Sequence, residues 1–329
     1  SGIDIARLNF AYNDIAQQSE EIQKLREVSV DGEEGLSVMA SLPGPKIRLR
    51  AFDNSLGDSE GKVTLAEDDR IELGYSADET CTDQDGVVDA DYRFYVDYEH
   101  IVDDLKTDET LYLNDGLVEF TVREVTEEFA YLDVVQEGEA KEFWGLTLPE
   151  TDLSVSVPTD RDRELLEAHA EELDLVSVSF VNDASELDDV RELLAEIGTD
   201  PVVVAKIETP GGMRNLRSIT EEADALMAAQ GDLAVEIGFD NLPYAVRKIN
   251  RVGNELDTPA IVATGVLKSI CQGGELSRTD RDHLYSLINE QRVEAIMLHS
   301  DLFRQEDSPD RVERISQSIL NIEDEALKP

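Results

Sequence analysis

Cysteines, basic residues and long apolar runs are scarce in this sequence, and each scarcity argues against a class of protein. The chain of 329 residues holds two cysteines, Cys81 and Cys271, whose separation forms no metal-binding motif and is typical of reduced cytosolic thiols. No run of about 18 apolar residues occurs, so we expect no membrane-spanning helix. The first ten residues lack the basic flank and apolar core of a signal peptide, which favours a cytoplasmic protein.

Acidic residues are correspondingly abundant. Asp and Glu number 74 against 29 Lys and Arg, which gives a formal net charge of −45. The acids are spread over turns and helix faces, for example in 20–27, 165–174 and 321–326, so the whole surface is expected to be acidic. Such a surface repels nucleic-acid polymers and anionic membranes and is typical of a halophilic, high-salt cytoplasm, where salt screens self-repulsion.

The stretch 201–232 contains the most informative polar residues. A valine-rich strand delivers Lys206 and Glu208 at its carboxyl end, and the alternation of side chains puts both on one face. A second apolar strand, 225–229, leads to Asp232. One cation and two carboxylates at neighbouring strand ends suit a site where a divalent metal meets an anionic substrate. The spacing alone equally allows a Lys206–Glu208 ion pair inside a barrel and Asp232 as a helix N-cap.

The order of the predicted elements indicates an α/β barrel interrupted by a β domain. A strand in 1–10, a helix in 14–27 and a strand in 36–41 form a βαβ unit, and the βα alternation resumes after residue 144. In between, short alternating segments and the turn signal Asn114-Asp115-Gly116 are typical of a small antiparallel β barrel. We therefore predict a discontinuous barrel, 1–48 and 144–329, with an inserted β domain at 49–143.

Several motifs resemble those of the pyruvate kinase family, in order and over nearly the whole chain. They are ARLNF at 6–10, GPKIR at 44–48, KIET at 206–209, QGDLAVEI at 230–237 and IVAT at 261–264. The resemblance implies a (β/α)8 TIM barrel with a β lid domain. Nothing matches the family's first barrel strand or its C-terminal regulatory domain, so seven barrel strands are expected and a homo-oligomer remains an open question.

The resemblance also implies an activity, which is Mg²⁺-dependent (or Mn²⁺-dependent) phosphoryl transfer between phosphoenolpyruvate and ADP, giving pyruvate and ATP. Glu208 and Asp232 would hold the metal, and Lys206 would face the transferring phosphoryl group.

The remaining family positions would contact the substrates. Arg7 and Arg48 would bind phosphates, with Asn9 helping to place them. The amides from Gly231 onward, with Asp232, would receive the substrate carboxylate. Thr264 would bind substrate and help deliver a proton to the enolate carbon.

Other positions depart from the family pattern. Ala11 and Ser41 replace two oxygen ligands of a monovalent cation, while the Lys46 ammonium can stand in for that ion, so K⁺ is not expected to be required. Gln230 replaces the arginine of the family's ARGD motif. This loss favours an alternative, a non-catalytic paralogue that binds nucleotide or phosphoenolpyruvate. A further alternative is aldolase or decarboxylase chemistry at an Mg²⁺-enolate site.

Overall fold

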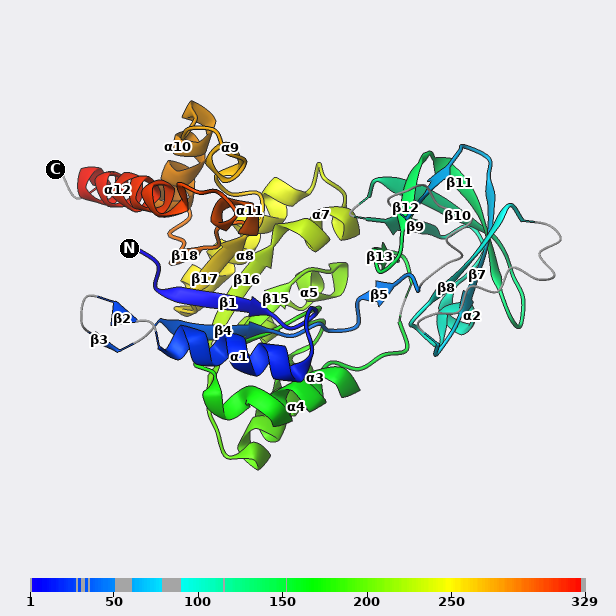
Figure 1. Ribbon diagram of the computed structural model, residues 1–329, viewed down its shortest axis with the longest axis horizontal. Helices are drawn as coiled ribbons and strands as arrows, with labels where there is room; N and C mark the ends of the chain where they lie inside the picture. The colour runs from blue at the N-terminus through cyan, green and yellow to red at the C-terminus, as the bar shows by residue number, and fades with distance from the viewer. Residues whose placement is uncertain are drawn as a thin grey trace. The chain divides into compact units, whose positions relative to one another are not determined.

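The structure is a computed structural model, and it describes residues 2–27, 29–30, 33–34, 36–50, 61–78, 90–114, 116–151 and 153–326. The chain packs into two units (Figure 1). The first comprises Ser1–Gly44, Ser156–Ala234 and Gly238–Pro329, and the second comprises Pro45–Val155 with Val235–Ile237. Cys81 and Asp115 lie outside the described residues, whereas Cys271 is a buried free thiol.

The first unit is built on one sheet of seven parallel strands. Their order is β1 (Ile5–Asn9), β4 (Ser37–Ser41), β14 (Leu175–Val178), β15 (Val202–Ile207), β16 (Ala225–Ala229), β17 (Ala260–Ala263) and β18 (Ala295–Ile296). Within the described part of the chain the sheet is open between β1 and β18, so it forms an incomplete barrel. Met39, Val204, Met227 and Ile261 pack together as an apolar cluster within this sheet. The α/β fold of the TIM-barrel type is thus confirmed, with seven strands.

Helices follow the strands of this unit. They are α1 (Ile15–Arg26), α3 (Asp160–His169), α4 (Ala184–Ile197), α5 (Pro210–Arg214), α6 (Leu216–Glu222), α7 (Gln230–Ile237), α8 (Leu242–Leu256), α9 (Lys268–Cys271), α10 (Arg278–Tyr285), α11 (Ser300–Phe303) and α12 (Ser308–Ala326). A 3₁₀ turn at Ala170–Glu172, a π-helix at Ser286–Glu290 and the small hairpin β2 (Ser29–Val30) and β3 (Glu33–Glu34) complete the unit. Capping boxes start four of the helices, from Asp14, Thr159, Asp183 and Ser277. No helix among the described residues combines the length and hydrophobicity needed to cross a bilayer.

The second unit is a small β structure. Its strands are β5 (Ile47–Arg48), β6 (Lys62–Leu65), β7 (Arg70–Tyr75), β8 (Tyr92–Val96), β9 (Thr110–Leu113), β10 (Val118–Val125), β11 (Ala130–Gln136), β12 (Gly138–Lys141) and β13 (Gly145–Thr147). The main sheet has the order β5-β13-β9-β10-β11-β7-β8, and a bridge between Leu49 and Val96 nearly closes it into a barrel. The turn signal correctly predicted the β9–β10 hairpin, where Asn114 and Gly116 both have positive φ.

Two features of this unit were not predicted. Strands β7 and β8 pair in parallel, although every other strand pair in this unit is antiparallel among the described residues. A single-turn helix, α2 (Ile101–Asp104), also interrupts the strands. The flanking strands β5 and β13 pair with each other, so the second unit extends to both sides of the range 49–143 that the sequence suggested.

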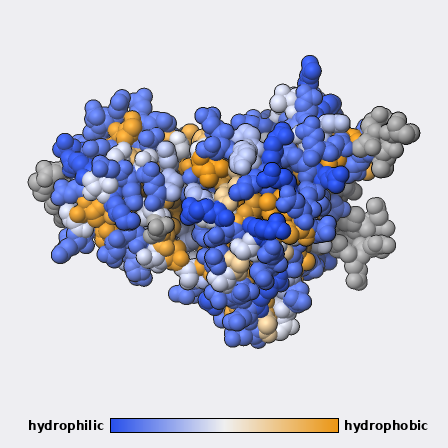
Figure 2. Space-filling view, turned by 180° about the vertical axis from the view of Figure 1, so that it is seen from behind, coloured by the Kyte–Doolittle hydropathy of each residue, from blue (hydrophilic) through white to orange (hydrophobic). Residues whose placement is uncertain are grey.

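The face of the molecule drawn in Figure 2 is predominantly hydrophilic. Figure 2 shows one face on which apolar residues form small, separate areas among hydrophilic ones. This distribution agrees with the excess of acidic residues in the sequence.

Candidate active site

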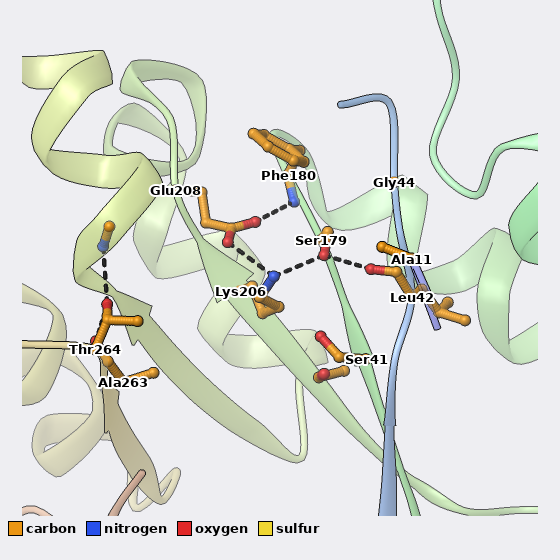
Figure 3. A network of polar contacts seen from close by, with 12 residues as sticks. Ala11, Ser41, Leu42, Gly44, Ser179, Phe180, Lys206, Glu208, Ala263 and Thr264 are labelled. Carbon is orange, nitrogen blue, oxygen red and sulfur yellow. Dashed lines mark hydrogen bonds and ion pairs between the residues drawn. The ribbon is translucent and has the colours of Figure 1, made fainter. Parts of the chain in front are cut away.

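A buried ion pair lies at the carboxyl end of β15. Lys206 is 7% exposed and Glu208 is fully buried, and the Lys206 Nζ is 2.8 Å from Glu208 Oε1 (Figure 3). The alternation of the strand places the two side chains on the same side, as predicted, with the buried Ile207 between them. A charge pair at this depth is costly to bury unless both partners are held by further contacts.

Each carboxylate oxygen of Glu208 has one partner. Its Oε2 accepts a hydrogen bond of 2.9 Å from the Phe180 amide, and the buried Oε1 is 2.8 Å from the Lys206 ammonium. Burial raises the pKa of Glu208, the Lys206 charge opposes this effect, and Asp232 raises the pKa further. An ionised carboxylate has about four acceptor sites, so Oε1 keeps capacity for a cation beside Lys206.

Lys206 is held by a second partner that directly follows the neighbouring strand β14. Its Nζ donates to Ser179 Oγ at 2.7 Å, and Ser179 in turn donates to the Leu42 carbonyl at 2.6 Å (Figure 3). The hydroxyl hydrogen of Ser179 is used in the bond to the Leu42 carbonyl, so the hydroxyl oxygen accepts from the ammonium through a lone pair. An ammonium has three donors, so this arrangement leaves capacity for an anionic ligand.

The turn after β4 is packed tightly against this site. Gly44 has φ +63°, and a Cβ there would lie 2.8 Å from the Ser179 Cβ, so only glycine fits. The Gly44 amide donates to Asp162 Oδ1 at 3.1 Å, which ties the turn to the start of α3. Sequence reasoning missed both Ser179 and Asp162; two serines in the otherwise apolar strand segment 175–181 were the available signal.

Arg7 reaches the same region from β1. Its Nη2 donates to the buried Ser41 Oγ at 2.8 Å, while Nε is buried without a partner. Burial lowers the pKa of Arg7, and the negative charges of Glu208 and Asp232 counteract this effect. The charges of both acids predicted to hold a metal therefore act on the Arg7 guanidinium, although β1 is separated from β15 by β4 and β14 in the sheet.

Asn9 has a more local role in this structure. It is exposed, and its Oδ1 accepts a hydrogen bond of 3.2 Å from the Ala11 amide. This contact closes the turn after β1.

Thr264 joins the end of β17 to the first turn of α7. The Gly231 amide donates to Thr264 Oγ1 at 2.9 Å, and Thr264 Oγ1 donates to the Ala263 carbonyl at 2.6 Å (Figure 3). The hydroxyl thus caps a helix whose N-cap residue, Ala229, supplies no side-chain bond. Asp232 lies within the first turn of α7, so the alternative that it is the N-cap is wrong.

The backbone at Thr264 is strained. Its φ is +60°, a region that a β-branched residue rarely adopts and that costs on the order of 1–3 kcal/mol. The Gln230 Nε2 donates to the Thr264 carbonyl at 2.7 Å. No sequence pattern signalled this conformation.

Arg48 and Lys46 belong to the second unit. The Arg48 Nη1 donates to the Phe143 carbonyl at 3.1 Å, and its amide donates to Asp97 Oδ1 at 2.7 Å. The Lys46 side chain lies across Gly145, where a Cβ would approach Lys46 Cε to 2.4 Å. Gly145 therefore provides the space that the lysine stem occupies.

The first-unit residues fit a hard divalent cation. Glu208 Oε1 is a buried oxygen with spare acceptor capacity, and Asp232 is close enough to raise the pKa of Glu208. No cluster of three or more metal-binding side chains occurs among the described residues. Two carboxylates leave coordination positions for substrate and water, which is how Mg²⁺ is commonly bound.

Comparisons with known proteins show which family the chain is similar to. The family model "Pyruvate kinase, barrel domain" matches residues 1–301. Similar proteins include a pyruvate kinase of Clostridium perfringens, 27% identical over 91% of this chain and 60% of that protein. Pyruvate kinase 2 of Synechocystis is 27% identical over 100% of the chain and 54% of that protein. A pyruvate kinase of Thermococcus litoralis is 30% identical over 82% and 54%, respectively. The chain thus spans about half to 60% of the length of these relatives.

Proposed function

Because the chain belongs to the pyruvate kinase family, we propose that it transfers a phosphoryl group between phosphoenolpyruvate and ADP, giving pyruvate and ATP. The observation that carries the proposal is the buried Lys206–Glu208 pair at the end of β15, with Arg7 sensing the same acids. Phosphoryl transfer needs charge neutralisation and positioning in a dry site, and these residues supply both.

In this proposal each side chain neutralises or orients one part of the reactants. Glu208 and Asp232 hold Mg²⁺ or Mn²⁺, which when bound neutralises charge on the substrate. The Lys206 ammonium, fixed by Ser179, stabilises the negative charge of the transferring phosphoryl group. Arg7 binds phosphate oxygens, and we propose the same role for Arg48 of the second unit from its GPKIR motif alone.

Thr264 is proposed to relay a proton from solvent to the methylene carbon of the enolate formed after phosphoryl loss. The carbon–carbon π electrons form the new C–H bond, and the enolate oxygen becomes the ketone oxygen of pyruvate. To donate outward, the Thr264 hydroxyl must rotate away from the Ala263 carbonyl. The Gly231 amide is already bonded to this hydroxyl, so the later amides of α7 are the better candidates for the substrate carboxylate.

Two observations favour the alternative, a paralogue that binds phosphoenolpyruvate or nucleotide without turnover. Both hydrogen-bonding functions of the Thr264 hydroxyl are used internally, and Gln230 stands where the family motif has arginine. Such a protein would still bind metal and ligand but would form no ATP. Aldolase or decarboxylase chemistry at the same site would instead consume a pyruvate-like acid without ADP.

The test measures Mn²⁺ binding and turnover in the same preparation. Wild type is compared with Glu208→Gln and with Glu192→Gln, a control at an exposed position. Each variant loses one negative charge, so the net charges of the two variants are matched. In molar salt, wild type and Glu192→Gln should bind Mn²⁺ in the presence of phosphoenolpyruvate and form ATP from ADP, while Glu208→Gln should do neither and remain folded. Mn²⁺ binding without ATP formation supports the non-catalytic alternative, and Mn²⁺ binding that survives Glu208→Gln refutes the metal site.

A further inference from the structure

The loop after β17 has an unusual backbone. Thr264, Gly265 and Leu267 all have positive φ, at +60°, +71° and +57°. Glycine adopts this region freely, but threonine and leucine do so at a cost. A segment with two such residues keeps its conformation only when surrounding contacts hold it.

The contacts that hold Thr264 come from the first turn of α7. The Gly231 amide fixes the hydroxyl at 2.9 Å, and the Gln230 side chain fixes the backbone carbonyl at 2.7 Å. Only the amide nitrogen of a glutamine can donate to a carbonyl, so the orientation of the Gln230 side chain is determined by its partner. One contact therefore holds the side chain of Thr264, and the other holds its backbone.

We infer that Gln230 is a positioning residue for Thr264. It holds the left-handed backbone that aims the Thr264 hydroxyl, and it contacts no reacting atom itself. The inference rests on the proposed function, in which Thr264 relays the proton to the enolate carbon. The replacement of the family's arginine is then a different way of fixing the loop rather than a sign of a lost site.

A positioning role affects proton transfer and substrate binding differently, and both can be measured. Loss of the Gln230 bond should slow proton transfer at the methyl carbon of pyruvate and leave binding of phosphoenolpyruvate nearly unchanged. A merely stabilising residue would lower every activity together, in proportion to the folded fraction.

The experiment compares Gln230→Met with wild type. Methionine has similar length but no N–H donor, and Gln272→Met makes the same change at an exposed position as a matched control. Proton transfer is measured by proton NMR as the rate at which the pyruvate methyl protons exchange with D₂O in the presence of Mg²⁺. Steady-state kinetics give the KM for phosphoenolpyruvate. The exchange rate of Gln230→Met should fall by about 3- to 10-fold, as for one lost neutral hydrogen bond, with KM within about two-fold and Gln272→Met unchanged.

The outcomes are distinguishable. An unchanged exchange rate in Gln230→Met, or an equal fall in exchange and in all other activities, overturns the positioning role. A wild type that neither exchanges protons nor forms ATP refutes the proposed function. In that event, crystal structures of wild type and Gln230→Met still test whether Gln230 holds the backbone of Thr264. Thr264 should leave the left-handed region in the variant, and an unmoved loop overturns the inference.

Discussion

Replacing Lys206 with methionine should cost far more stability than removing a partly exposed lysine. The Lys206 Nζ and Glu208 Oε1 are 2.8 Å apart, a distance at which two unit charges attract by about 6 kcal/mol at an effective dielectric constant of about 20. Desolvation offsets much of this attraction, but Lys206→Met leaves the fully buried Glu208 without its partner. Breaking one side of such a pair typically costs about 3–5 kcal/mol.

A double variant and a variant of a second lysine test whether the unpaired charge of Glu208 causes the loss of stability. Lys206→Met with Glu208→Gln removes both charges, so it should recover most of the loss. Lys62→Met breaks a half-exposed pair with Glu139 and should cost under about 1 kcal/mol. The free energy of unfolding is measured by urea denaturation at fixed molar salt, with circular dichroism for the whole chain and fluorescence of Trp144, the single tryptophan, for the second unit.

The pH dependence gives a further check. Burial raises the pKa of Glu208 and the Lys206 charge opposes this effect, so Lys206→Met raises the Glu208 pKa of the folded state further above its ordinary value. The loss in Lys206→Met should therefore be smallest below the ordinary glutamate pKa of about 4.3 and should grow as the pH rises. If Lys206→Met costs no more than Lys62→Met, or if the double variant is as unstable as the single one, the account of a buried charge pair is wrong.

Two further predictions concern ions and protons. On the prediction that the Lys46 ammonium stands in for the monovalent ion, activity should persist when K⁺ is replaced by a large organic cation at equal ionic strength. Lys46→Glu with Ala11→Ser and Ser41→Asp should then install a K⁺ requirement in the same kinetic assay. His169 is 1% exposed with both ring nitrogens buried and unpartnered, and burial lowers its pKa, so stability should fall as the pH drops below the ordinary value of about 6.5. His169→Phe should weaken this dependence in urea midpoints at pH 5 and 7.5, and equal slopes would contradict the assignment.

Local patterns in the sequence predicted what local geometry determines. The alternation of β15 put Lys206 beside Glu208, and the turn signal at Asn114 predicted a hairpin. Contacts across strands could not be predicted in the same way, because they depend on register. The Ser179 bond to Lys206 joins residues 27 positions apart, and the Gln230 bond to Thr264 spans 34 positions. The parallel pairing of β7 with β8 likewise depends on tertiary contacts rather than on alternation.

The pairing of β5 with β13 affects how the first unit can assemble. Strands β4 and β14 are neighbours in its sheet, yet the hydrogen bond from Ser177 to the Ala40 carbonyl joins positions 137 apart. Strands β5 and β13 pair through Arg48 with Gly145 and Ile47 with Leu146. Once they are paired, the loop that must close to bring β4 beside β14 no longer includes the residues between β5 and β13. The effective loop shrinks roughly fourfold, and at about 0.6 kcal/mol per doubling of length its closure costs about 1 kcal/mol less. A second unit that folds early therefore lowers the entropic barrier to forming the central strands of the first.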